Sequence, residues 1–66
     1  MPNVDLTPRE LEVVKLLTQG MSNRSIAECL SFSQHTAKFH VASIAKKLGV
    51  KTRIEVALLA VRAGLV

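Results

Sequence analysis

Five basic side chains occur between Cys29 and Ile54, a stretch of the chain that contains no acidic residue. They are Lys38, Lys46, Lys47, Lys51 and Arg53. Cations that have no carboxylates among them attract an anionic partner. On a chain of 66 residues with a net charge of +4, nucleic acid is the first candidate, and anionic lipid is a weaker one.

The other reactive side chains do not have the spacing of a catalytic or metal site. His35 and His40 are five positions apart, so they do not share one helical face as two metal ligands would. No serine or aspartate has a spacing to either histidine that supports a catalytic triad. The single cysteine, Cys29, excludes an internal disulfide and a cysteine-rich metal site, and we interpret it as a small buried residue. We therefore expect no enzyme activity, no cofactor and no metal.

Four helices are predicted to position the basic residues, in one all-α domain that spans residues 1–66. The expected helices run from Pro8 to a stop at Gln19-Gly20, from Arg24 to about Leu30, from Gln34 to Leu48 and from Arg53 to Ala63. Residues 1–6 are interpreted as a short leader. They lack the pattern of a secretory signal, and no apolar run is long enough to span a bilayer. We expect a soluble cytoplasmic protein that has no membrane contact.

The first and second helices have recognisable start signals. Thr7 is the predicted N-cap of the first helix, with Glu10 three positions later as in a capping box. Its inward stripe is expected to be Leu11, Val14 and Leu17. Either Ser22 or Asn23 is expected to cap the second helix.

The third helix has two different faces. At about 100° per residue, one apolar line is formed by Ala37, Val41, Ile44 and Leu48. The opposite face gathers His35, Lys38, Phe39, Ala42 and Lys46. The aromatic ring of Phe39 is thus expected on the basic side of the helix, away from the core.

Residues 23–42 fit the helix-turn-helix plan, in which two helices are joined by a break of a few residues. The second helix of such a pair projects its outer face into the major groove of DNA, and donors at helix ends hold phosphates. The face described above is therefore a predicted base-reading surface. The predicted phosphate donors at the helix ends are Ser22, Asn23, Arg24 and Thr36.

The fourth helix, residues 53–63, is apolar almost all the way round. We expect one of its faces, made of Ile54, Ala57, Leu58 and Val61, to fill the core. The other apolar residues, Val56, Leu59, Ala60 and Ala63, are then predicted to form a dimer interface. For Arg53 we expect an ion pair with Glu10 or Glu12 of the first helix.

Residues Leu6 to Val66 also resemble a known family. The motifs LTPRE, G-x-SN-x-x-IA, T-x-K-x-H and KLGV occur in that order. Together they are similar to the LuxR-type (GerE-like) DNA-binding domain, the output module of bacterial response regulators and quorum-sensing activators. The resemblance implies a four-helix fold, sequence-specific binding of double-stranded DNA through the third helix, and a homodimer on DNA formed by the fourth. It also implies RNA polymerase, and an upstream receiver or ligand-binding domain, as partners in transcription regulation.

The resemblance assigns roles to particular positions. Lys38 matches the lysine of T-x-K-x-H and is the strongest candidate for a base contact, with Phe39, His35 and Ala42 beside it. The matching phosphate contacts are Asn23, Arg24, Thr36, His40, Lys46 and Lys47. Two residues depart from the family pattern: Ala37 is smaller than the usual Val or Ile, and Ala42 replaces a basic or polar reader. The second change favours contact with a thymine methyl group.

Two other functions fit parts of this pattern. A promoter-recognition module like region four of a sigma factor also contains a helix-turn-helix. A protein-interaction module would use the apolar fourth helix to bind a partner, and its basic helix would only keep the domain soluble.

Overall fold

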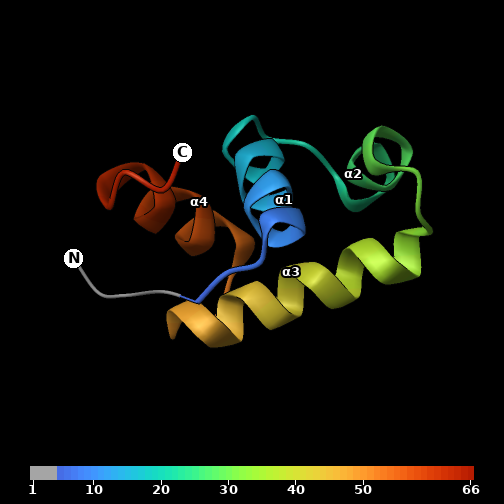
Figure 1. Cartoon of the computed structure of the whole chain (residues 1–66). Coiled ribbons are helices and arrows are strands. Elements are labelled where there is room, and N and C mark those ends of the chain that lie inside the picture. Colours follow the sequence, from blue (N-terminus) through green and yellow to red (C-terminus); the bar gives the residue numbers. More distant parts are fainter. Residues whose placement is uncertain (1–4) are drawn as a thin grey trace.

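The computed structural model describes residues 5–66, which form four α-helices and no strand (Figure 1). The helices are α1 (Pro8–Thr18), α2 (Asn23–Leu30), α3 (Gln34–Leu48) and α4 (Arg53–Arg62). The all-α prediction is confirmed, and α3 has the predicted bounds. Most of the predicted leader, residues 1–4, lies outside the described residues.

Each helix begins at a hydroxyl residue whose side-chain oxygen accepts a hydrogen bond from the backbone N–H three positions later. The four N-caps are Thr7, Ser22, Ser33 and Thr52. In α1 and α4 the bond is reciprocal, because the carboxylates of Glu10 and Glu55 accept from the backbone N–H of the cap. These bonds satisfy backbone donors that the first turn of a helix leaves unpaired, and each cap stabilises the fold by about 1 kcal/mol.

The turn between α2 and α3 is held by a residue in the left-handed conformation. Ser31 has a φ of 61°, the only positive φ at a non-glycine among the described residues. After it, the backbone N–H of Phe32 donates to the carbonyl oxygen of Ala27 over 3.0 Å. The chain therefore reverses within three residues, and α3 starts immediately afterwards at its Ser33 cap.

The core lies where α1 packs against α3 and α4 and where α2 packs against α3. In Figure 1, α3 runs along the lower edge of the molecule, with the other three helices above it. The buried apolar residues are Val13, Val14, Leu17, Ile26, Ala27, Ala37, Ile44, Ala45, Val56 and Ala60. Ala27 and Ala37 are both buried, as expected for the small residues that let α2 and α3 approach closely.

The inward stripe of α1 differs by one position from the prediction. Leu11 is exposed, whereas Val13 is fully buried beside Val14 and Leu17. The stripe therefore follows the spacing i, i+3, i+4 and i+7 from Glu10, which is itself 4% exposed. The apolar pattern of the sequence did not reveal this stripe, because its first residue, Glu10, is charged.

The two faces of α4 are the reverse of those predicted. Val56 and Ala60 are fully buried, so these two residues do not belong to a dimer surface, whereas Leu59 and Ala63 are half-buried. Three of the four residues expected in the core are instead at the surface, because Ile54 is 76% exposed, Leu58 51% and Val61 61%. The fourth, Ala57, is half-buried. Because α4 packs closely against α1, the smaller side chains face inward and the larger ones face solvent.

Two further features concern the surface of the described part. Cys29 is exposed, so its interpretation as a buried residue is wrong. No helix within residues 5–66 is both long and apolar enough to cross a membrane.

Candidate nucleic-acid interface

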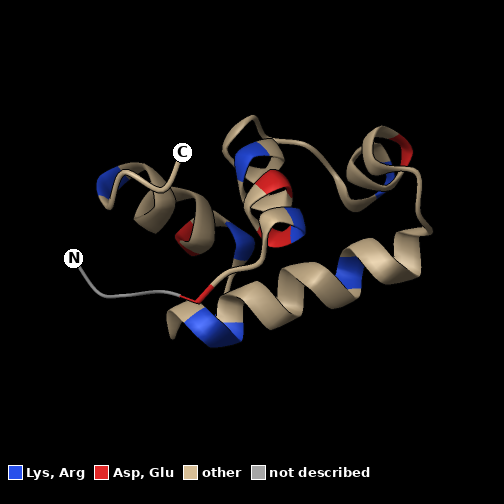
Figure 2. Ribbon diagram, in the orientation of Figure 1, with Lys and Arg blue, Asp and Glu red and all other residues tan. Residues whose placement is uncertain are grey.

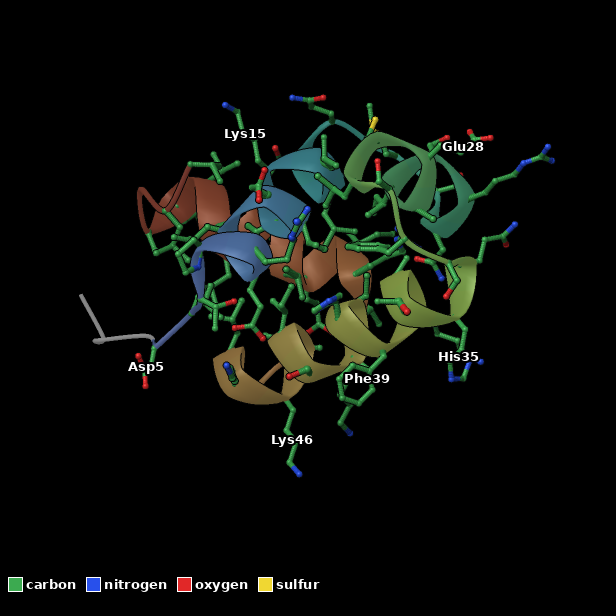
Figure 3. All side chains as sticks on the ribbon, turned by 45° about the vertical axis from the view of Figure 1, so that its right-hand side comes forward. Asp5, Lys15, Glu28, His35, Phe39 and Lys46 are labelled. Carbon is green, nitrogen blue, oxygen red and sulfur yellow. The ribbon has the colours of Figure 1, made fainter. Side chains whose placement is uncertain are left out.

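One face of α3 points away from the other three helices. All five residues predicted for this face are exposed: His35, Lys38, Phe39, Ala42 and Lys46. In Figure 3, His35, Phe39 and Lys46 project together on the far side of α3, opposite Lys15 and Glu28. The structure thus brings the predicted base-reading residues onto one continuous surface.

The opposite face of α3 holds it to the body of the domain. Ala37 and Ile44 are buried and Val41 and Leu48 are half-buried, as predicted, and Ala45 is buried as well. Because this seam fixes the rotation of α3 about its own axis, it also fixes which side chains face outward.

Phe39 is 67% exposed, although it is one of two phenylalanines in the chain. Its ring edge meets the His40 ring at 6.2 Å between centroids. It borders a shallow hollow of about 320 Å³ lined by Ala42, Ser43 and Lys46. An apolar strip of this kind, with cations beside it, can contact the edge of a base pair in the major groove.

His40 is half-buried between two aromatic rings. The Phe32 ring, from the turn before α3, lies 5.3 Å from the His40 ring, centroid to centroid. The Arg9 guanidinium lies 5.9 Å above the centre of the Phe32 ring. His40 therefore packs the turn against α3.

Charge is distributed unevenly over the four helices. Figure 2 shows acidic and basic residues mixed on α1, α2 and α4, whereas α3 carries only basic ones. All three lysines of α3 are exposed, but only Lys38 and Lys46 make no hydrogen bond or ion pair among the described residues. The outer face of α3 is thus electropositive where it is most accessible.

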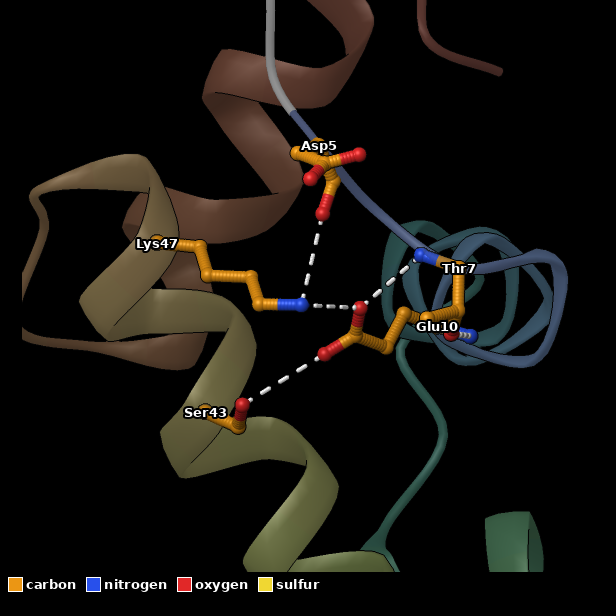
Figure 4. Close-up of polar contacts among 5 residues, drawn as sticks. All are labelled: Asp5, Thr7, Glu10, Ser43 and Lys47. Atoms are coloured by element: carbon orange, nitrogen blue, oxygen red, sulfur yellow. Dashed lines mark hydrogen bonds and ion pairs between the residues drawn. The ribbon is translucent and has the colours of Figure 1, made fainter.

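Lys47, one residue further along α3, is part of an ion pair (Figure 4). Its Nζ lies 2.8 Å from Oε1 of Glu10 and donates to the carbonyl oxygen of Asp5 over 3.3 Å. Glu10 also accepts from the Thr7 backbone N–H at 2.9 Å and from the Ser43 hydroxyl at 3.4 Å. The ammonium group of Lys47 is therefore bound to a buried carboxylate, and its contact with phosphate stays a prediction.

The surroundings of Glu10 have opposing effects on its ionisation. Burial raises the pKa of Glu10, but the hydrogen bonds from Lys47 and Thr7 and the charge of Lys47 lower it. The net effect is a pKa below the usual value of 4.5. Glu10 is thus ionised at neutral pH, and its contact with Lys47 joins the start of α1 to the end of α3.

The start of α2 presents the other predicted phosphate contacts. Ser22 caps the helix, Arg24 is exposed, and the Arg24–Glu28 ion pair is a loose surface contact of 4.0 Å. Thr36, at the start of α3, bonds through both its N–H and its hydroxyl to the Ser33 hydroxyl. The first turns of both helices also contain backbone N–H groups that have no partner within the helix.

Asn23, the first residue of α2, accepts a hydrogen bond from Arg53, for which the sequence predicted a different partner. The Arg53 guanidinium donates from Nη1 to Oδ1 of Asn23 at 2.9 Å and from Nη2 to the Met21 carbonyl oxygen at 2.7 Å. The expected ion pair of Arg53 with Glu10 or Glu12 is not formed. A cation at the first position of a helix, such as Arg53, is unfavourable beside the positive end of the helix dipole. Its presence there could have indicated that Arg53 has a specific partner outside α4.

The comparisons with known proteins agree with this geometry. The model of the family described as bacterial regulatory proteins, luxR family, matches residues 4–60. The nitrate/nitrite response regulator NarL of Escherichia coli K12 is 43% identical over 53 residues, which are 80% of this chain and 24% of NarL. The transcriptional regulatory protein LnrK of Bacillus subtilis 168 is 44% identical over 61 residues, or 92% of this chain and 28% of LnrK.

A solved structure has the same fold. The response regulator ChrA of a heme-sensing two-component system superimposes with a TM-score of 0.89 at 38% identity, over 100% of this chain and 33% of ChrA. The chain thus spans between a quarter and a third of the length of these relatives. The match to the luxR family also decides against the sigma-factor-like alternative. The chain belongs to the luxR family of bacterial regulatory proteins, and its four helices are the DNA-binding helix-turn-helix domain of that family.

Proposed function

We propose that this domain binds double-stranded DNA sequence-specifically by inserting α3 into the major groove, as part of a bacterial transcription regulator. The observation that carries the proposal is the outer face of α3, which is exposed, contains no acid and projects away from the rest of the domain (Figure 3). An α-helix with such a face fits the width of the major groove, and the bases can be read only from there in full.

Base reading is assigned to four side chains of that face. Lys38 donates to acceptor atoms on the edge of a purine, most simply O6 and N7 of guanine. Phe39 and Ala42 present apolar surface to thymine methyl groups, and His35 lies at the end of the face nearest the start of α3.

Contacts with the phosphate backbone are assigned to residues near the start of α2 and along α3. Those on or next to the start of α2 are Ser22, Asn23 and Arg24, and those on α3 are Thr36, His40 and Lys46. Contacts of this kind fix the register of a protein on DNA and supply most of its salt-sensitive affinity.

The exposed face of α4 is proposed as the surface that joins two domains on DNA. Ile54, Leu58 and Val61 lie at the spacing i, i+4 and i+7 and are all exposed. Exposed large apolar side chains in a row favour burial against an apolar partner. A second copy of this domain supplies the same row, and a two-fold pair would read a two-fold symmetric site.

The control of this domain is proposed to come from outside the described helices. NarL and ChrA are response regulators and are three to four times as long as the segment they share with this chain. We propose a receiver or ligand-binding domain as the source of the signal and RNA polymerase as a partner in its output.

The direct experiment is in vitro selection of bound duplexes from a random DNA library. The proposal predicts an enriched motif with two-fold symmetry that the purified domain binds in a fluorescence anisotropy titration. A library that remains random after repeated selection at low salt would show that α3 does not read bases.

The exposed apolar face of α4 also supports a second candidate, a protein-interaction module. Gel filtration with and without the selected duplex separates the two functions. Self-association that DNA does not enhance, together with no DNA complex at low salt, favours the interaction module. Dimers that form on the duplex favour the regulator.

A further inference from the structure

A single side chain of α4 connects that helix to the start of α2 by hydrogen bonds. Arg53 is the first residue of α4, and its half-buried guanidinium reaches 30 positions back to Asn23 and 32 back to Met21. Within residues 5–66, no other side chain of α4 hydrogen-bonds to α2 or to the turn before it. The two bonds come from two nitrogens of one planar group, a geometry that arginine provides and lysine does not.

This contact fixes the orientation of the Asn23 amide. Its oxygen, Oδ1, accepts from Arg53, and its nitrogen, Nδ2, has no hydrogen-bond partner in the described part of the chain. No buried side-chain nitrogen or oxygen there lacks a partner, so Nδ2 reaches the surface of the molecule. The amide nitrogen of Asn23 is therefore accessible to a partner, next to the Ser22 cap.

The orientation matters because an amide has two chemically opposite ends. An Asn23 side chain free to rotate would present its oxygen to a phosphate in part of the population, and two acceptors repel. A guanidinium bound to the oxygen removes that orientation, since guanidinium is a donor only. Ordering the group before binding also lowers the entropy lost when the contact forms.

We propose that Arg53 is a positioning residue for DNA binding, which holds Asn23 with its amide nitrogen directed at a backbone phosphate. The inference rests on the proposed function, because it assigns the means by which one of the phosphate contacts is prepared. It also places the first turn of α4 in two roles. Arg53 orients a phosphate contact, and the neighbouring Ile54 belongs to the proposed dimer face.

The test is a double-mutant cycle read out at individual phosphates. The variants are Asn23→Ala, Arg53→Met and the double substitution, and the control is Arg62→Met, which removes a charge from the exposed far end of the same helix. Each protein is titrated against the selected duplex and against duplexes in which one phosphate at a time is a neutral methylphosphonate.

We expect Asn23→Ala and Arg53→Met to lose DNA affinity, and to lose it at one and the same phosphate. Asn23→Ala and Arg53→Met each weaken binding by about ten-fold, the size expected for a lost hydrogen bond to a charged group. The double variant is no weaker than either single one. The same phosphate becomes insensitive to neutralisation in both, whereas Arg62→Met keeps the parental phosphate profile.

Two results would overturn the inference. One is additivity, in which Arg53→Met weakens the Asn23→Ala protein as much as it weakens the parent. The other is that Arg53→Met lowers the contribution of every phosphate to affinity by the same amount. Such a uniform effect would come from the loss of a positive charge in general or from a destabilised fold. Thermal unfolding of each variant is followed by circular dichroism. If Arg53→Met does not fold, Arg53→Lys replaces it, and a smaller loss of affinity is expected at the same phosphate. If the parent binds no duplex, the proposed function fails before Arg53 is tested.

Discussion

At the scale of single residues, Phe39 is the side chain whose position most needs a function. A phenylalanine that is 67% exposed leaves apolar surface in water, which is unfavourable for the isolated domain. The structure explains how it is held there, since the buried seam of α3 fixes the rotation of the helix. In the proposed complex with DNA, thymine methyl groups of the major groove would cover this ring.

This interpretation of Phe39 predicts sensitivity to a single methyl group in the DNA. Replacing thymine by uracil at each position of the selected duplex removes only the 5-methyl group. At the contacted thymine, the parent protein should bind about 0.8 kcal/mol more weakly, roughly four-fold in affinity. Phe39→Ala should not respond at that position, as measured by anisotropy. A response to uracil that is unchanged in Phe39→Ala at every position contradicts the assignment.

Glu10 predicts a dependence of stability on pH. Its folded pKa is lowered below 4.5, so its contribution to stability is complete above that pH and is lost as the pH falls through the folded value. Urea denaturation between pH 7 and pH 3 should therefore show a steeper loss of stability for the parent than for Glu10→Gln. Equal slopes for the two proteins in the acid range would show that the contact with Lys47 does not stabilise the ionised carboxylate.

At the scale of helices, local signals predicted most of the boundaries. The predicted bounds of α3 are those of the structure, where Ser33 caps the start of the helix and Gly49 caps its end. The register of α4 was not predictable in the same way, because a helix that is apolar on all sides has no period to read. The ion pair of Glu10 with Lys47 was also missed, since the two residues are 37 positions apart and no local pattern connects them.

The corrected register of α4 predicts opposite effects for two neighbouring substitutions. Val56→Ala removes buried methyl groups and should lower the free energy of unfolding by roughly 1–3 kcal/mol. Ile54→Ala should change it by no more than about 0.5 kcal/mol, yet it should weaken dimer formation on DNA. Urea denaturation and gel filtration with the duplex measure the two effects. Destabilisation by Ile54→Ala with none by Val56→Ala would restore the register expected from sequence.

At the scale of the whole molecule, charge separates the proposed DNA-binding side from the rest of the domain. Lys46 is exposed on the outer face of α3, whereas Lys15 is exposed on the opposite side of the domain (Figure 3). Lys47 lies next to Lys46 in the chain but joins α3 to α1. The basic composition alone could not distinguish these roles, because the distinction depends on which carboxylate the fold brings to each lysine.

This separation predicts how salt affects DNA binding. The slope of log affinity against log salt should be steep, at about −0.9 for each phosphate neutralised. Lys46→Ala should make the slope less negative by about 0.9 for each domain bound, whereas Lys15→Ala should leave it unchanged. Equal slopes for the parent and Lys46→Ala would exclude Lys46 as a phosphate contact.

The central claim is that the outer face of α3 reads base sequence, and Lys38 tests it most directly. The measurement is a set of anisotropy titrations of the parent, Lys38→Ala and Lys15→Ala against the selected duplex and its single-base variants. We predict that Lys38→Ala weakens specific binding by roughly 1–3 kcal/mol and loses discrimination at one base position, while Lys15→Ala behaves as the parent. Lys38→Ala binding as tightly and as selectively as the parent would contradict the account.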